Sequence, residues 1–174
     1  TTGLMENLLH WVKSQMNSAH VSPQPLNIGF IIEEVVNVQK LQASSKKISI
    51  RCEIPKHSMV YADKDTVTLV LRNLLSNAIK FTPASGKINV RLKTEGGFSK
   101  ISILDNGIGM DAETIGRIHQ NNYYSTHGTA KESGTGLGLM LCKEFLARNG
   151  ASLTIESEPG KGSTFSFLLP ASID

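Results

Sequence analysis

The stretch NLLSNAIKFT at residues 73–82 decides the fold of this sequence, because it ends a periodic helix and carries polar residues inside it. The helix is predicted over about 63–82, with a core face made of Val67, Val70, Leu71, Leu74 and Ala78. Asn73, Asn77 and Lys80 follow at spacings of four and three residues, so they project from one neighbouring stripe. Since asparagine is a poor helix-interior residue, this polar stripe indicates a surface turned towards a cleft.

The side chains of the polar stripe suit two kinds of ligand. Amide oxygens bind a hard cation, and a lysine ammonium binds phosphate. Taken alone, however, an Asn-x-x-x-Asn pair is more often a solvated polar face. The functional interpretation therefore depends on companion motifs elsewhere in the chain.

Two glycine-rich stretches are candidates for such companions. DNGIG at 105–109 stands where a predicted strand ends, and the Asp105 carboxylate can accept a hydrogen bond from an exocyclic amine. Its two glycines permit positive φ and close backbone approach. GTGLG at 134–138 opens directly into a helix, whose N-terminal N–H groups and dipole suit phosphate. An ordinary turn and a helix-capping loop are the alternatives.

The rest of the chain alternates between helical and strand periodicity. Further helices are predicted from Asn27, as N-cap, to about Ser45, after Asp111, and over 137–148. Strands are predicted over 48–54, 59–61, 88–92, 101–103, 152–157 and 164–169, with turns at 95–97 and 159–162. Because these elements lack strict strand-helix-strand order, they predict an α+β two-layer sandwich, a mixed, mostly antiparallel sheet with helices on one face.

A short helix is predicted at the start of the chain, where an apolar seam is formed by Met5, Leu9, Val12 and Met16. Two heptads leave open whether this seam dimerises or packs on the neighbouring domain. Two prolines and several small polar residues make 17–26 a linker, so the chain divides into 1–26 and a domain over 27–174. Because it enters a helical pattern at once, without an initiator methionine, we expect a piece of a longer protein.

Composition argues against several classes of protein. The net charge is only +3 and the basic residues are spread along the chain, so no nucleic acid partner is expected. Cys52 and Cys142 lie far apart without histidines at ligand spacing, which argues against a zinc site or a disulfide framework and fits a reduced, cytoplasmic setting. Apolar runs fall short of the roughly 18 to 20 residues that span a bilayer.

Four motifs, in this order, resemble the nucleotide-binding Bergerat fold shared by sensor histidine kinases, type II topoisomerases, mismatch-repair ATPases and a heat-shock chaperone. The N box is resembled by NLLSNAIKFT (73–82), the two glycine boxes by DNGIGM (105–110) and GTGLGL (134–139), and the terminal strand motif by GKGSTFSFLLP (160–170). The resemblance covers about residues 27–170. Its closest form is the catalytic ATP-binding domain of a bacterial sensor histidine kinase.

The resemblance implies an adenine pocket. Asp105 would bind the adenine amino group, with Thr164 supporting that contact. Phe81 would line the purine pocket, although ordinary core packing is the alternative for this side chain. The pocket and its lid would be shaped by Gly107, Gly109, Gly134, Gly136, Leu137 and Gly138.

The resemblance also implies ATP and Mg²⁺ as cofactors. Asn77 would ligate Mg²⁺, Asn73 would support it, and Lys80 would touch phosphate. The ATP-hydrolysing members carry a water-activating glutamate where this chain has Asn73, which points to phosphotransfer over hydrolysis.

The histidine that accepts phosphate in these kinases is normally followed by an acidic residue. None of the five histidines here has that neighbour: His10, His20, His57, His119 and His127. We therefore interpret them as structural or surface residues and the start of the chain as the end of the second helix of a phosphoacceptor domain. Between the glycine boxes the usual aromatic and basic residues are replaced, with Tyr123 and Tyr124 as substitutes for the aromatics and Lys131 or His127 for the basic residue.

These implications add up to a histidine kinase that transfers the γ-phosphate of Mg²⁺-ATP to a histidine on a dimerisation domain absent from this chain. The isolated fragment is not expected to autophosphorylate. A homodimeric parent protein would pass the phosphate to a response-regulator receiver domain, and its anchoring in the inner membrane is left open. The alternatives are a degenerate kinase acting as a nucleotide-binding regulatory module, and an ATPase or serine kinase with the same pocket.

Overall fold

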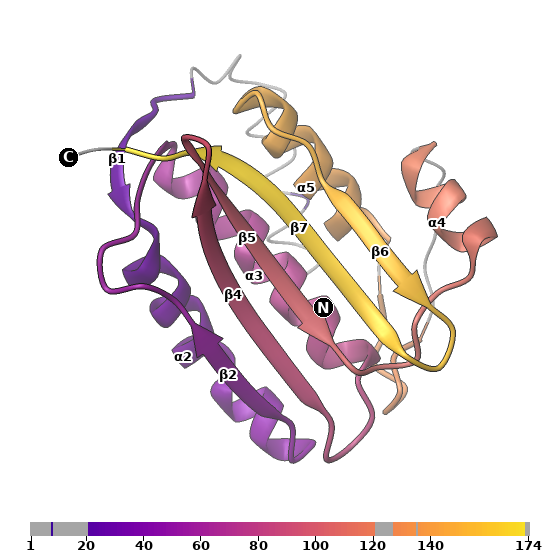
Figure 1. The fold of residues 1–174 in the computed structure, drawn as a ribbon. Helices are drawn as coiled ribbons and strands as arrows, with labels where there is room; N and C mark the ends of the chain where they lie inside the picture. Colours follow the sequence, from indigo (N-terminus) through magenta and orange to yellow (C-terminus); the bar gives the residue numbers. More distant parts are fainter. Residues whose placement is uncertain (1–7, 9–20, 121–126, 135, 173–174) are drawn as a thin grey trace.

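The computed structural model describes residue 8 and residues 21–120, 127–134 and 136–172. Its main layer is a five-stranded sheet in the order β2-β4-β5-β7-β6 (Figure 1). The strands are β2 (Ser49–Glu53), β4 (Lys87–Glu95), β5 (Phe98–Asp105), β6 (Thr154–Glu158) and β7 (Gly162–Pro170). The β2–β4 pairing is parallel, and the other three pairings are antiparallel.

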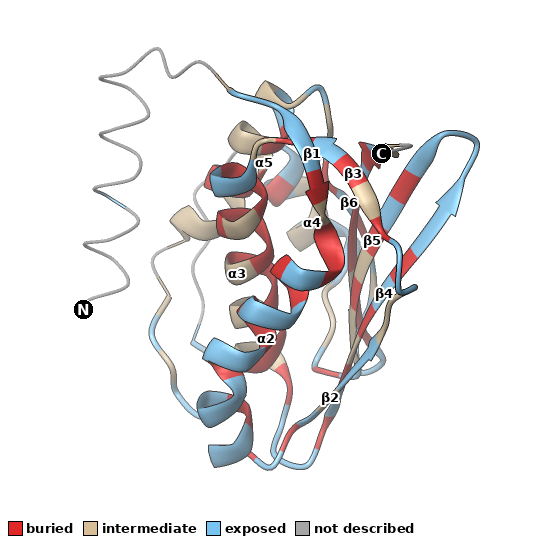
Figure 2. Ribbon diagram, turned by 90° about the vertical axis from the view of Figure 1, so that its left-hand side faces the viewer, coloured by how far each residue is buried: buried red, intermediate tan, exposed pale blue. Residues whose placement is uncertain are grey.

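The second layer consists of helices on one face of this sheet (Figures 1 and 2). They are α2 (Ile28–Ser45), α3 (Lys64–Phe81) and α5 (Leu137–Arg148). A shorter helix, α4 (Ala112–His119), is held to α5 by Lys143, whose Nζ donates to the carbonyl oxygens of Ile118 and His119, each at 2.9 Å. The arrangement confirms the predicted α+β sandwich with a mixed, mostly antiparallel sheet.

Local capping explains where the two long helices begin. The Asn27 side chain accepts a hydrogen bond from the backbone N–H of Gly29 at 3.0 Å, which makes it the N-cap of α2 as predicted. The Asp63 carboxylate accepts from the N–H of Thr66 at 2.9 Å at the start of α3. Because α3 then runs to Phe81, the whole polar stripe belongs to one rigid helix.

The core between the two layers fixes α3 against the sheet. Leu74 and Ile79 of α3 are fully buried, as are Ile88 of β4 and Ile101 of β5. Burying each such side chain stabilises the fold by roughly 1.5–3 kcal/mol. Among the described residues, none of the helices combines the length and apolarity needed to cross a membrane.

One part of the predicted linker is a strand. β1 (Gln24–Asn27) pairs antiparallel with β3 (Met59–Ala62) in a second, two-stranded sheet. Proline lacks the N–H that a central strand must donate, but it is tolerated on an edge strand such as the one that contains Pro25. Leu26 is buried there, so the packed domain begins before residue 27. The predicted helix over the first sixteen residues lies outside the described part of the chain, except for Leu8.

Candidate active site

The first residue of the polar stripe, Asn73, lies where α3 packs against α5. Asn73 is only 9% exposed, and a Cβ atom added to Gly138 in the first turn of α5 would lie 3.6 Å from its Oδ1. The Asn73 Nδ2 atom is buried without a hydrogen-bond partner among the described residues, apart from the weakly accepting thiol of Cys142. A buried amide with so weak a partner costs free energy, which distinguishes Asn73 from an ordinary solvated polar residue.

The next two members of the stripe are half-buried. Asn77 and Lys80 lie one and two turns further along α3. The Lys80 ammonium stands 4.8 Å from the centre of the Phe81 ring, close enough for a cation–π contact. Partial burial lowers the pKa of Lys80, while the nearby Glu132 carboxylate acts in the opposite direction. The structure therefore brings Asn73, Asn77 and Lys80 together on one side of α3.

Asp105, the last residue of β5, is held by one of its two carboxylate oxygens. Its Oδ1 accepts from the backbone N–H of Gly107 at 2.9 Å and from that of Ser163 at 3.2 Å. Among the hydrogen bonds of the described residues, Oδ2 remains an open acceptor. Burial raises the pKa of Asp105, and the two backbone hydrogen bonds act against that shift.

The first glycine stretch packs directly on the end of α3. The Ile108 N–H donates to the Phe81 carbonyl at 3.1 Å, and a Cβ added to Gly107 would lie 2.3 Å from that carbonyl oxygen. Gly109 has a φ of 68°, and a Cβ there would meet the Glu158 carbonyl oxygen at 2.0 Å. These close approaches require glycine and bring Asp105 to the end of α3 that carries Phe81.

The second glycine stretch forms the entry to α5. Gly136 is the N-cap, with a left-handed φ of 69°, and it has no side chain with which to cap the helix. Leu137 and Gly138 form the start of the helix, and Gly134 precedes the turn. The first N–H groups of α5 thus start beside Asn73, with the positive end of the helix dipole.

The structure does not bring Thr164 to Asp105. In the β5–β7 pairing Thr164 stands opposite Leu104, whereas Ser163 stands opposite Asp105. Side chains of successive strand residues point to opposite faces of a sheet, so Ser163 shares the helix-covered face with Asp105 and Thr164 does not. The Ser163 hydroxyl lies 2.8 Å from the Ser157 hydroxyl, which also donates to the Gly162 carbonyl.

The segment between the glycine stretches is described only from residue 127 onwards, so the expectation for Tyr123 and Tyr124 lies outside the described residues. Lys131 lies in a turn that begins at Gly128, and the turn is held by Lys46 through a 2.8 Å bond to Glu132. Sequence reasoning missed Lys46, because no motif marks it. His127 precedes this turn and is exposed.

A metal ion at this site would depend on neutral ligands. In the described part of the chain, no group of three or more His, Cys, Asp or Glu side chains is placed to hold a metal. Mg²⁺ is usually bound through one or two protein oxygens together with substrate phosphates and water. The Asn73–Asn77 stripe beside the start of α5 fits such a shared site.

The comparison with protein families agrees with this geometry. Residues 62–173 match the family model of histidine kinase-, DNA gyrase B- and HSP90-like ATPases. The match covers well over half of the chain, and the chain belongs to this family.

Curated relatives of this chain include sensor kinases. The sensor protein EvgS of Escherichia coli K12 is 31% identical over 178 residues, which cover 98% of this chain and 15% of EvgS. The adaptive-response sensory kinase SasA of Synechocystis is 33% identical over 169 residues, 96% of this chain and 44% of SasA. The chain thus spans less than half the length of these relatives.

Solved structures with the same fold include histidine kinases. The nucleotide-free catalytic domain of histidine kinase ThkA superposes with a TM-score of 0.75 at 26% identity, covering 86% of this chain and 96% of that domain. Full-length ShkA in complex with AMPPNP has a TM-score of 0.81 at 24% identity, over 98% of this chain and 36% of that one, and shows the shared fold. Fold, site and relatives identify a histidine kinase ATP-binding catalytic domain.

Proposed function

We propose that this chain binds Mg²⁺-ATP between the polar stripe of α3 and the lid that the two glycine stretches bound, and presents the γ-phosphate to a histidine on a separate dimerisation domain. The observation that carries the proposal is the position of Asp105, whose Oδ1 is held by two backbone N–H groups while Oδ2 stays open. An acceptor fixed in this way is suited to the exocyclic amine of adenine. ShkA, which shares the fold, is a complex with AMPPNP.

The adenine would lie against the end of α3. Phe81 is half-buried at that end, and the hydrogen bond from the Ile108 N–H to its carbonyl holds the loop after Asp105 beside it, so we expect its ring to line a purine pocket. Ser163, on the same face as Asp105, takes the supporting place expected for Thr164. Its hydroxyl is already ordered by Ser157, which favours a fixed contact over an adaptable one.

The phosphates would lie between the polar stripe and the start of α5. Asn77 and Asn73 would hold Mg²⁺ with their amide oxygens. Lys80 would add an ammonium, and the first N–H groups of α5 would add oriented dipoles. The Mg²⁺ ion supplies charge neutralisation at the transferred phosphoryl group.

The reaction expected from this arrangement is transfer and not hydrolysis. A water nucleophile needs a base, and the buried position facing the first turn of α5 carries the amide of Asn73 and no carboxylate. An imidazole nucleophile brings its own lone pair, so positioning and charge neutralisation suffice. The five histidines of this chain lack the acceptor pattern, so the nucleophile would come from outside it.

Because the nucleophile would come from outside this chain, the proposed reaction requires partner domains. The parent protein would be a homodimer whose dimerisation domain carries the acceptor histidine, and a response-regulator receiver domain would take the phosphate onward. A crystal structure of ThkA, at 22% identity, is a complex with the response regulator TrrA. We further propose that the domain acts in the cytoplasm, with the anchoring of the parent protein as a separate question.

The test is a transfer assay on the longer natural protein, with Mg²⁺ and γ-labelled ATP. We expect acid-labile, base-stable label on histidine in the native sequence and its loss in Asn77→Ala. Asn37→Ala, an exposed asparagine of α2, is the matched control and should retain transfer. Release of inorganic phosphate without labelled protein would favour an ATPase, and nucleotide binding without transfer would favour a degenerate kinase.

A further inference from the structure

Lys46, at the C-terminal cap of α2, makes four hydrogen bonds with its side chain. It is 9% exposed, and its ammonium donates to the carbonyl oxygens of Ile79 at 2.8 Å and Lys80 at 3.1 Å. It also donates to Thr129 Oγ1 at 2.7 Å and to Glu132 Oε1 at 2.8 Å. One buried cation thus joins the end of α3 to a turn that is about 50 residues further along the chain.

The bonds to α3 compensate the end of that helix. The last carbonyl groups of a helix have no partner inside it and carry the negative end of its dipole. A lysine ammonium is costly to bury unless oxygens surround it, and here four oxygens share its three protons. The position of this side chain is therefore fixed from two directions.

The Gly128–Glu132 turn is docked on Lys80 as well. The Thr129 N–H donates to the Lys80 carbonyl at 3.0 Å, and a Cβ added to Gly128 would lie 2.5 Å from Lys80 Cγ. Within the turn, the Gly128 N–H donates to the Glu132 carbonyl at 2.9 Å and the Ala130 N–H donates to Glu132 Oε2 at 2.8 Å. Both carboxylate oxygens of Glu132 are therefore engaged away from Lys80.

We propose that Lys46 is a positioning residue for Lys80: by pairing with Glu132, it keeps that carboxylate from capturing the Lys80 ammonium and leaves the ammonium available for nucleotide phosphate. The inference rests on the proposed function, because it assigns a reason for the availability of a phosphate contact. It adds a role for Lys46 and Glu132, neither of which is placed against the nucleotide; Lys46 meets the site through the backbone carbonyl of Lys80.

The competition follows from simple electrostatics. Glu132 lies beside Lys80, because a Cβ added to Gly128 would be 2.3 Å from Glu132 Oε2 and 2.5 Å from Lys80 Cγ, so the two opposite charges attract each other across a partly buried region. While Lys46 is present, Glu132 Oε1 accepts a hydrogen bond from the Lys46 ammonium at 2.8 Å. If Lys46 loses its charge, Glu132 is free to pair with the Lys80 ammonium beside it, and a phosphate must then compete with that carboxylate.

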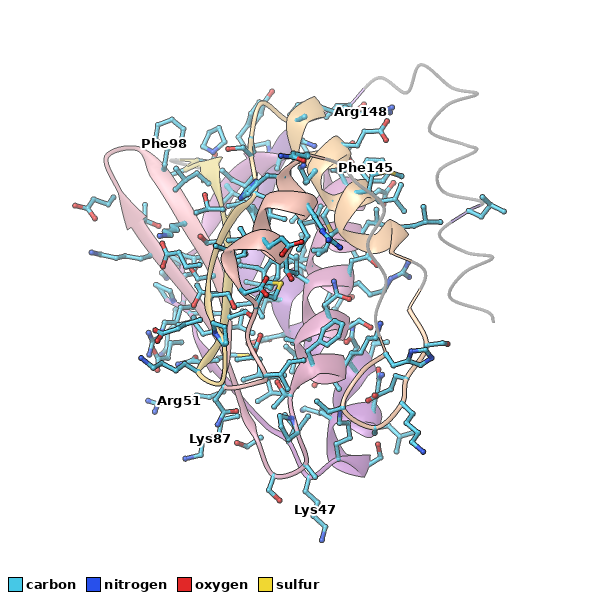
Figure 3. All side chains as sticks on the ribbon, turned by 90° about the vertical axis from the view of Figure 1, so that its right-hand side faces the viewer. Lys47, Arg51, Lys87, Phe98, Phe145 and Arg148 are labelled. Atoms are coloured by element: carbon cyan, nitrogen blue, oxygen red, sulfur yellow. The ribbon has the colours of Figure 1, made fainter. Side chains whose placement is uncertain are left out.

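The prediction separates phosphate binding from adenine binding. Lys46→Met should weaken binding of Mg²⁺-AMPPNP roughly tenfold, the scale of one charge-assisted hydrogen bond, and leave the affinity for adenosine unchanged. Lys46→Met combined with Glu132→Gln should recover most of the AMPPNP affinity, because the competing carboxylate is gone. Lys47→Met is the matched control, since Lys47 is the next residue and projects away from the molecule (Figure 3).

The experiment is calorimetric titration with Mg²⁺-AMPPNP of the native chain, Lys46→Met, Glu132→Gln, the double variant and Lys47→Met. Adenosine binding is followed by NMR, and folding is followed by thermal denaturation. Equal losses of AMPPNP and adenosine affinity in Lys46→Met, or no recovery in the double variant, would overturn the inference. If Lys46→Met does not fold, Glu132→Gln decides: its AMPPNP affinity should equal or exceed that of the native chain, and a selective loss would overturn the inference. Failure of the native chain to bind AMPPNP would instead refute the proposed function, and the inference with it.

Discussion

Replacing Gly107 by alanine tests the contact on which the proposed pocket is built. A Cβ at this position would lie 2.3 Å from the Phe81 carbonyl oxygen and 2.8 Å from Asp105 Oδ1. The first neighbour is backbone in the last residue of α3, which cannot rotate away. The loop must therefore retreat by on the order of 1 Å to reach an ordinary contact. That retreat strains the Ile108-to-Phe81 hydrogen bond, now 3.1 Å, and displaces the adenine acceptor.

Overpacking of this kind costs roughly 1–3 kcal/mol. For a chain of this size, about 1 kcal/mol lowers the Tm by roughly 2–4 °C, so Gly107→Ala should lower it by roughly 2–12 °C. Differential scanning calorimetry measures the change directly. AMPPNP binding, measured on the folded variant, should fall as well.

Gly116→Ala is the matched control. Gly116 lies inside α4, where an added Cβ has no neighbour within 4 Å, so alanine should stabilise the helix by about 0.5–1 kcal/mol. The two glycine-to-alanine changes are thus predicted to have opposite signs. A Gly107→Ala variant as stable as the native chain, with unchanged nucleotide affinity, would show that this loop does not rest on the end of α3.

Two further predictions concern buried titratable groups. Because burial raises the pKa of Asp105, the folded state holds its proton more tightly than the unfolded state does, and stability is lost as pH rises from the ordinary carboxyl pKa through the raised one. Asp105→Asn keeps an oxygen that can accept from both backbone N–H groups but has no carboxyl proton to lose. The Tm of this variant should therefore exceed the native Tm by an amount that grows as the pH rises through that window. A difference in Tm that stays constant or reverses would contradict burial as the origin of the raised Asp105 pKa. Burial raises the pKa of Cys142 to about 12; it also raises the pKa of Cys52, but the Cys52 side chain is exposed and accessible to a reagent. A disulfide reagent at pH 8 should therefore modify one thiol rapidly and the second only on unfolding, and two rapid thiols would place Cys142 at the surface.

The helices were predictable from the sequence because their ends carry local signals. Asn27 and Asp63 cap α2 and α3 with their own side chains, and Gly136 and Asn149 bound α5 at the predicted residues. The glycine pair at 96–97 likewise marks the β4–β5 hairpin, with positive φ at both positions. Helix ends and tight turns depend on a few neighbouring residues, so they can be predicted from a single sequence.

The missed features depend on partners far away in the chain. β1 is a strand because β3 pairs with it, and Pro25 conceals that pairing in a pattern analysis. Lys46 looks like a surface lysine at the end of a helix, and only its contacts with Ile79 and Glu132 show otherwise. Tertiary contacts of this kind leave no periodic trace.

Ser163 is a different case, because a signal was present. Phe165, Phe167 and Leu169 alternate as the core face of β7, which assigns Ser163 to the same face and Thr164 to the other. Motif resemblance favoured the threonine, whereas strand parity favours the serine. The register with Asp105 decides between them.

The most direct test of the account is calorimetric titration of this chain, Asp105→Asn and Asp65→Asn with Mg²⁺-AMPPNP. Asp65 is an exposed carboxylate in the first turn of α3, so its variant controls for a lost charge. In Asp105→Asn the open Oδ2 becomes a donor if the amide oxygen keeps the two backbone bonds, and the adenine amine loses its acceptor. We predict Mg²⁺-dependent binding that Asp65→Asn retains and Asp105→Asn weakens at least tenfold, the scale of a charge-assisted hydrogen bond. Equal affinity in all three proteins would contradict the adenine assignment, and absence of binding by the native chain would contradict the proposed nucleotide site as a whole.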